Sequence, residues 1–67
     1  MNIEEAMVAI IEEAERQGFQ IAQTRSGAWR IAKDGKNYFF PVPSSALELL
    51  EILHELIVAG LDWSRWE

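Results

Sequence analysis

The sequence contains no cysteine and only one histidine, His54. Disulfide bonds are therefore excluded, and a closed structural zinc site is disfavoured because its ligands come mainly from cysteine and histidine. We expect neither a metal ion nor another cofactor. A chain of 67 residues without such cross-links depends on apolar burial or on oligomerisation for its stability. Its hydrophobic content of 49% is that of a globular protein, and we expect a single domain over residues 1–67.

The sequence also lacks any apolar run that approaches the roughly 18 residues of a membrane-spanning helix. Its first residues include Glu4 and Glu5, where a secretory signal peptide would carry positive charge. We therefore expect a cytoplasmic protein that makes no membrane contact.

Positive charge is scarce, with six Lys and Arg against 11 Asp and Glu, and the net charge is −5. This balance disfavours RNA as a partner, because nucleic-acid binding requires Lys and Arg to neutralise phosphates. The distribution is uneven, since residues 16–38 hold five of the six cations and residues 1–15 hold five glutamates. The pattern predicts acidic helices beside a basic sheet.

Two helices and three strands are indicated by hydrophobic periodicity and by their end signals. Asn2 and Ser45 are each followed three residues later by a glutamate, which is the spacing of a helix N-cap. Asp34-Gly35 separates two alternating segments and is a strong hairpin signal. The predicted elements are a helix over 2–17, strands over 19–24, 28–33 and 36–41, a helix over 45–59 and a tryptophan-containing tail over 61–67. We predict an α+β fold of order α-β-β-β-α, a three-stranded antiparallel meander with both helices packed on one face.

The hairpin register gives the two faces of the sheet different compositions. Trp29 falls on the core face and is assigned to the core edge, whereas Arg30 and Phe39 fall on the outer face, with Arg25 at the adjoining turn. An aromatic ring beside guanidinium groups can stack on a base or hold a phosphate. Equally, the Arg30 stem can simply cover Phe39. These three outer-face residues are the first candidate binding surface.

The helix predicted over 45–59 has more apolar positions than one small sheet can cover. Leu47 and Val58 widen its apolar stripe on one side, and Trp63 and Trp66 follow in the tail. Protein interfaces are enriched in tryptophan and depleted in charge, so these four residues are the second candidate binding surface. A homodimer through this helix and the tail would use the same residues. The alternative is internal packing that completes a small core.

Catalytic chemistry has few candidate residues. Nucleophilic catalysis needs a nucleophile with a base in reach, and the single histidine lies within a mostly apolar helix. Adjacent glutamates, as at Glu12 and Glu13, are typical of a solvated helix surface. The four glycines fall at element boundaries and form no phosphate-binding loop. We predict no catalytic residue and no enzymatic activity.

A set of boundary signals matches a known family. These are a helix running into Gly18-Phe19, a turn ending in Gly27, a Val42-Pro43 exit from the last strand, and a final helix ending in Ala59-Gly60-Leu61. In this layout the chain resembles the HicA family of toxin ribonucleases, which have a double-stranded-RNA-binding-domain type of fold. The resemblance implies the order α-β-β-β-α and an RNA-cleaving activity.

The chain departs from that family at the residue that matters for cleavage. HicA-like toxins carry a histidine on the second strand, soon after the glycine that corresponds to Gly27. The resemblance implies that this histidine takes part in RNA cleavage. Trp29 stands at the matching position, and its indole cannot act as a general acid or base. The family is also typically basic, whereas this chain is acidic.

Together these observations predict a non-catalytic domain of HicA-like or double-stranded-RNA-binding-like fold that binds another protein. By analogy, such a small acidic protein would suit a phage or mobile-element accessory factor, including an inhibitor of a host enzyme. Two alternatives stay open. One is a HicA-like mRNA-cleaving toxin of a toxin–antitoxin pair, with a different catalytic group. The other is an RNA-binding module without catalysis.

Overall fold

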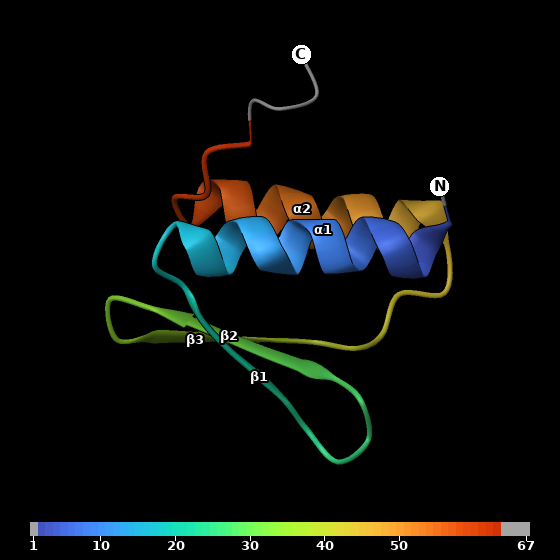
Figure 1. Ribbon diagram of the computed structural model, residues 1–67, viewed down its shortest axis with the longest axis horizontal. Helices are drawn as coiled ribbons and strands as arrows, with labels where there is room; N and C mark the ends of the chain where they lie inside the picture. Colours follow the sequence, from blue (N-terminus) through green and yellow to red (C-terminus); the bar gives the residue numbers. More distant parts are fainter. Residues whose placement is uncertain (1, 64–67) are drawn as a thin grey trace.

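The computed structural model describes residues 2–63. Its elements are α1 (Ile3–Arg16), β1 (Gln20–Gln23), β2 (Trp29–Lys33), β3 (Lys36–Phe40) and α2 (Ala46–Val58). The strands form one antiparallel sheet in the order β1-β2-β3, and both helices lie on one face of it (Figure 1). The predicted α+β fold of order α-β-β-β-α is confirmed.

The elements begin and end within about a residue of the predicted bounds, because several of the predicted end residues are caps. The Asn2 side chain accepts a hydrogen bond from the Glu5 N–H at 2.8 Å and begins α1. The Ser45 hydroxyl accepts one from the Glu48 N–H at 3.2 Å and begins α2. The Glu48 carboxylate reaches back to Ser44, one residue before the cap. Each helix therefore starts at a side chain that satisfies an otherwise unpaired backbone donor.

The sheet has the register that its two turns impose. Asp34 and Gly35 have φ values of 54° and 81°, so both lie in the left-handed region that a two-residue type I′ turn requires. This turn makes Lys33 the partner of Lys36 and sets Arg30 opposite Phe39. The register places alternate residues of β2 toward the helices and the others toward the outer face.

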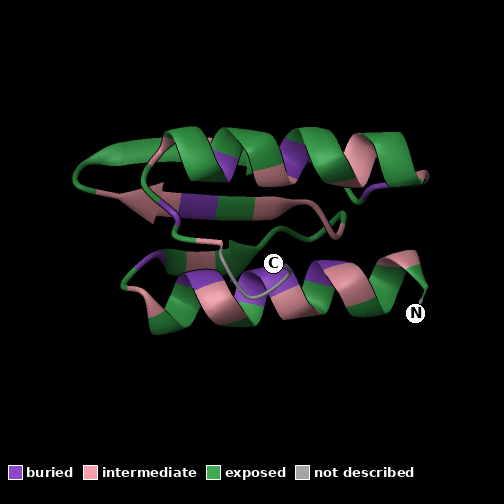
Figure 2. Cartoon of the chain, turned by 90° about the horizontal axis from the view of Figure 1, so that it is seen from above, coloured by how far each residue is buried: buried purple, intermediate pink, exposed green. Residues whose placement is uncertain are grey.

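A single apolar core fills the space between the helices and the sheet, and no polar side chain is buried within residues 2–63. Figure 2, seen from above, shows buried segments on both helices and on the strand that is visible between them. Ile31 in the central strand and Leu56 in α2 are completely buried. Trp29 and Tyr38 are half-buried at the margin of this core. The other buried residues of this core are Met7, Ile10, Ile11, Ala14, Phe19, Phe40, Ile52 and Leu61, and Pro43 is buried after β3.

Candidate binding surfaces

The outer face of the sheet brings Arg30 and Phe39 together as direct cross-strand partners. Phe39 is 66% exposed, and the Arg30 Nε donates to the Asn37 Oδ1 at 3.4 Å. The Arg30 stem therefore leaves most of the Phe39 ring open to solvent. Of the two interpretations of this pair, the geometry favours an accessible aromatic beside a guanidinium group over a shielded one.

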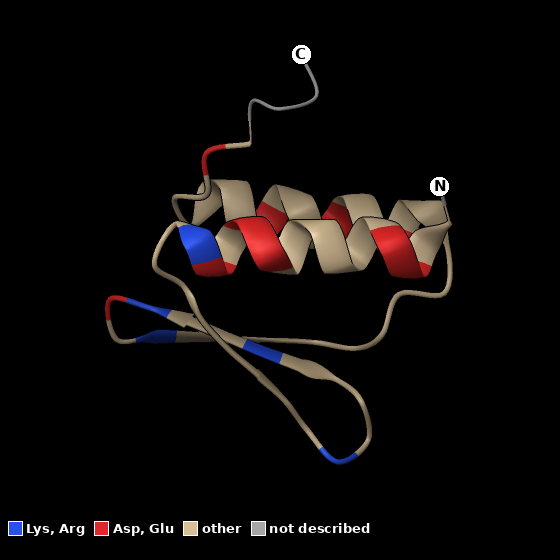
Figure 3. Cartoon of the chain, viewed as in Figure 1, with Lys and Arg blue, Asp and Glu red and all other residues tan. Residues whose placement is uncertain are grey.

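The other cations do not all join this pair. Figure 3 shows Lys and Arg mainly on the sheet and its turns, and Asp and Glu mainly on the helices, as the charge distribution predicted. Arg25 lies exposed in the turn between β1 and β2, outside the ladder that holds Arg30 and Phe39. Lys33 turns inward, with its Nζ 4.5 Å from the centre of the Phe19 ring. The basic character of the outer face is therefore concentrated at Arg30.

The second candidate surface lies on α2, whose apolar residues exceed what the fold covers. Leu47 and Val58 are 67% and 75% exposed, and Leu50 and Ile57 are exposed between them. Leu47 and Val58 are three helical turns apart and lie on the same side of α2, about 16 Å from one another at 1.5 Å per residue. The aliphatic face of α2 thus consists of two exposed patches directed away from the core, one at each end of the helix. The exposed Glu51 and His54 lie between these patches on the same side.

The tail residue Trp63 packs on the body instead of extending this face. It is half-buried against the core and lines a hollow of about 320 Å³ with residues of both helices. The amide of Gln17 holds the preceding Asp62 backbone by two hydrogen bonds, of 2.7 and 2.8 Å. This placement of Trp63 agrees with the internal-packing interpretation. Trp66 lies outside the described residues.

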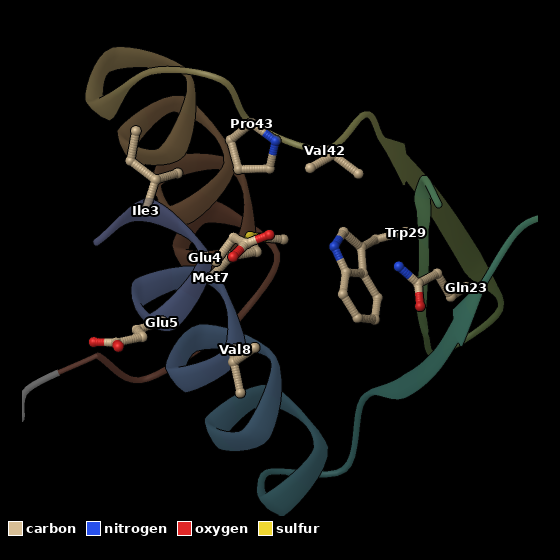
Figure 4. Close-up of a pocket in the computed structure, with 9 residues that line it drawn as sticks. All are labelled: Ile3, Glu4, Glu5, Met7, Val8, Gln23, Trp29, Val42 and Pro43. Atoms are coloured by element: carbon tan, nitrogen blue, oxygen red, sulfur yellow. The ribbon is translucent and has the colours of Figure 1, made fainter. Parts of the chain in front are cut away.

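A cleft of about 520 Å³ opens between the first half of α1 and the sheet, and sequence patterns did not reveal it. Figure 4 shows the Trp29 ring facing α1 across this space. Trp29, assigned from the sequence to the core edge, is half-buried and also forms a wall of the cleft. The lining residues are Ile3, Glu4, Glu5, Met7, Val8, Gln23, Trp29, Val42 and Pro43.

A second groove of about 280 Å³ lies between β3 and α2. Three glutamates of α2 line its helical side at a spacing of three and four residues, so they share one side of the helix. The lining residues are Phe39, Phe40, Pro41, Pro43, Glu48, Glu51, Ile52 and Glu55. The glutamate spacing was visible in the sequence, but the strand that it faces was not.

Residues 2–63 contain no cluster of three His, Asp or Glu side chains arranged to hold a metal ion. Neither helix in this part of the chain has the length and apolar composition needed to cross a membrane. In comparisons with known proteins, no protein family, no curated protein and no solved structure matches the chain. The surfaces are therefore interpreted from their geometry and chemistry.

Proposed function

We propose that this chain is a non-catalytic binding domain that acts by contacting another protein. The observation that supports it is the aliphatic face of α2, where Leu47 and Val58 are largely exposed. Burying such a side chain contributes about 1.5–3 kcal/mol, and a small domain has few residues to spare for this purpose. Side chains of this kind left at the surface are typical of a face that a partner covers.

The absence of catalysis is part of the same proposal. Trp29 occupies the strand position at which the resembled ribonucleases carry a histidine, and an indole transfers no proton. In this proposal the domain is cytoplasmic and shares the HicA-like fold without its chemistry. An accessory factor of a phage or mobile element, such as an inhibitor of a host enzyme, is the role that suits a small acidic domain.

Affinity capture with a matched pair of variants tests the proposal. The double variant Leu47→Lys, Val58→Lys places two cations on the aliphatic face, and Gln20→Lys, Ala22→Lys adds the same charge to exposed positions of β1. We expect a protein captured from cells of the source organism by the wild type and by the β1 variant to be lost with the α2 variant. Equal capture by all three proteins would reject the α2 face.

The same variants determine whether the partner is a second copy. If α2 forms a homodimer, sedimentation at high micromolar concentration will give a dimer for the wild type and a monomer for the α2 variant. A wild-type monomer under these conditions rejects the homodimer and leaves a different protein as the partner.

A second candidate function is RNA binding, which the Arg30–Phe39 pair on the open face of the sheet favours. In this case single-stranded RNA binds with an affinity that falls steeply with salt and that depends on Arg25 and Arg30. No measurable binding at low salt removes this candidate. Cleavage of the RNA that is lost in Arg30→Ala would instead support the toxin alternative.

A further inference from the structure

β3 is an edge strand of the sheet, and no second strand within residues 2–63 pairs with its outer side. The two-residue turn makes Lys33 and Lys36 a hydrogen-bonded pair, and bonding then alternates along the antiparallel ladder. Every second residue from Lys36 therefore bonds to β2, whereas Asn37 and Phe39 direct their N–H and C=O groups away from the sheet. An open edge of this kind is a template for an additional strand.

α2 follows the course of β3 on that side of the sheet in the view of Figure 2. Residues of α2 make one wall of the β3–α2 groove. The buried side chains of Phe40 and Ile52 form its apolar floor. Phe39 stands on the opposite, outer face of β3 and is largely exposed. A strand added to β3 would thus have one face against α2 and the groove floor, and the other face beside the Phe39 ring.

The charge of the groove determines which strand fits it. Glu51 and Glu55 form no ion pair with any residue in the described range 2–63, whereas Glu48 is engaged by Ser44. Glu51 and Glu55 are one turn apart on α2, about 6 Å along its axis. Alternate residues of a strand are separated by about 6.7 Å, so two cations at alternate positions match these two carboxylates.

We propose that the β3–α2 groove binds an extended, basic segment of a partner protein, which adds to β3 as a fourth strand. The segment carries Lys or Arg at alternate positions facing α2, and β-branched or apolar residues between them beside Phe39. This inference rests on the proposed function as a protein-binding domain, and it names the chemistry of the bound segment.

The same charges disfavour the other occupants of this edge. Pairing β3 with β3 of a second copy would bring two acidic sides of α2 together and create repulsion between like charges. RNA would place its phosphates against Glu51 and Glu55. A basic peptide is the occupant that both the open backbone groups and the glutamates accept.

A designed peptide tests the proposal directly. The probe is acetylated and amidated Thr-Lys-Val-Lys-Val-Lys-Thr, titrated into the 15N-labelled full chain and followed by NMR. We expect the amide signals of Asn37 and Phe39 to shift and their hydrogen exchange to slow, because these N–H groups gain carbonyl partners. A peptide N-methylated at the amides that would face β3 is the control, and it should not bind.

Charge variants separate the groove from general attraction between opposite charges. We expect Glu51→Gln, Glu55→Gln to weaken peptide binding about tenfold, the upper part of the range for two exposed ion pairs. Glu4→Gln, Glu5→Gln removes the same charge from α1 and should leave binding nearly unchanged.

Three results would each overturn the groove proposal: no shift at Asn37 and Phe39, equal binding of the N-methylated peptide, or equal loss in both pairs of glutamate variants. The proposed function has its own readout in the Leu47 and Val58 variants. If the peptide fails but capture depends on Leu47 and Val58, the groove proposal falls and the proposed function stands. If both fail, both fall.

Discussion

Gln17 and Asp62 are joined by two reciprocal hydrogen bonds, although 45 residues separate them. The Asp62 N–H donates to the Gln17 Oε1 at 2.8 Å, and the Gln17 Nε2 donates to the Asp62 carbonyl at 2.7 Å. This amide connects the C-terminal end of α1 to the segment that follows α2. It holds that segment where Leu61 is buried and Trp63 packs on the body.

Replacing this amide should therefore loosen the tail. We expect Gln17→Ala to lower the free energy of unfolding by about 1 kcal/mol, since the two hydrogen bonds to Asp62 are lost together with the bond that the Gln17 Nε2 donates to the Glu13 carboxylate. Urea denaturation measures the change, with Gln20→Ala on the sheet edge as the control. An equal and small effect of both substitutions would show that the tail does not need the Gln17 contact.

Two leucines of α2 give a matched test of the core. Leu56 is completely buried and Leu47 is 67% exposed, so the same change to alanine has different consequences. We expect Leu56→Ala to lower the free energy of unfolding by about 3 kcal/mol through lost burial and the cavity that remains. Leu47→Ala should change it by less than about 0.5 kcal/mol, as is usual for surface positions. Thermal or urea denaturation distinguishes the two, and a large loss in Leu47→Ala would mean that its side chain contributes to the fold.

The hairpin turn requires glycine at position 35 for its backbone conformation, and not because a side chain there would clash with a neighbour. Gly35 has a φ of 81°, and a Cβ added there would meet nothing within 4 Å. Gly35→Ala should therefore destabilise the protein only through its left-handed backbone, by about 1 kcal/mol. The expected drop in Tm is about 4–8 °C for a domain of this size. Asp34→Asn, at a φ of 54°, retains a residue that tolerates this region and should leave the Tm nearly unchanged.

The cap of α2 makes stability depend on pH. The Ser44 hydroxyl and backbone N–H both donate to the Glu48 carboxylate, and they lower the pKa of Glu48 below its ordinary value of 4.5. As the pH falls, the unfolded chain takes up this proton before the folded chain does. The contribution of Glu48 is therefore fully present above pH 4.5 and is lost as the pH falls through the folded-state pKa.

NMR titration of the Glu48 carboxyl carbon measures this effect. We expect Ser44→Ala to raise the pKa of Glu48 toward its ordinary value, because the hydroxyl is the main cause of the shift. In parallel, the free energy of unfolding of the wild type should exceed that of Glu48→Gln by more at about pH 7 than at about pH 3. A pKa of Glu48 that is the same in both proteins would show that the Ser44 hydroxyl does not stabilise the Glu48 carboxylate.

Local signals in the sequence account for most of the fold. Asp34-Gly35 determines the register because a two-residue turn permits only one pairing, and Asn2 and Ser45 locate the helix starts through side-chain oxygens. The exposure of Leu47 and Val58 follows from an apolar arc wider than a small sheet can cover. These features depend on residues close together in the chain.

The features that the sequence did not reveal depend on how separate elements are placed. The Gln17 contact with Asp62 joins two polar residues that no periodic pattern relates. The cleft beside Trp29 depends on the spacing between α1 and the sheet, which the Val42-Pro43 segment helps to line. The β3–α2 groove depends on which helix lies over which edge strand, a choice that hydrophobic patterning leaves open.

The meander order of the sheet also bears on how quickly the domain can form. Each strand pairs with its neighbour along the chain through a turn of a few residues, so the sheet needs little loop closure. Proteins dominated by such local contacts fold rapidly. The contact between α1 and α2 is the long-range step, because it brings together helices at opposite ends of the chain. We therefore expect docking of α2 onto α1 to be the step in which chain entropy most limits the folding rate.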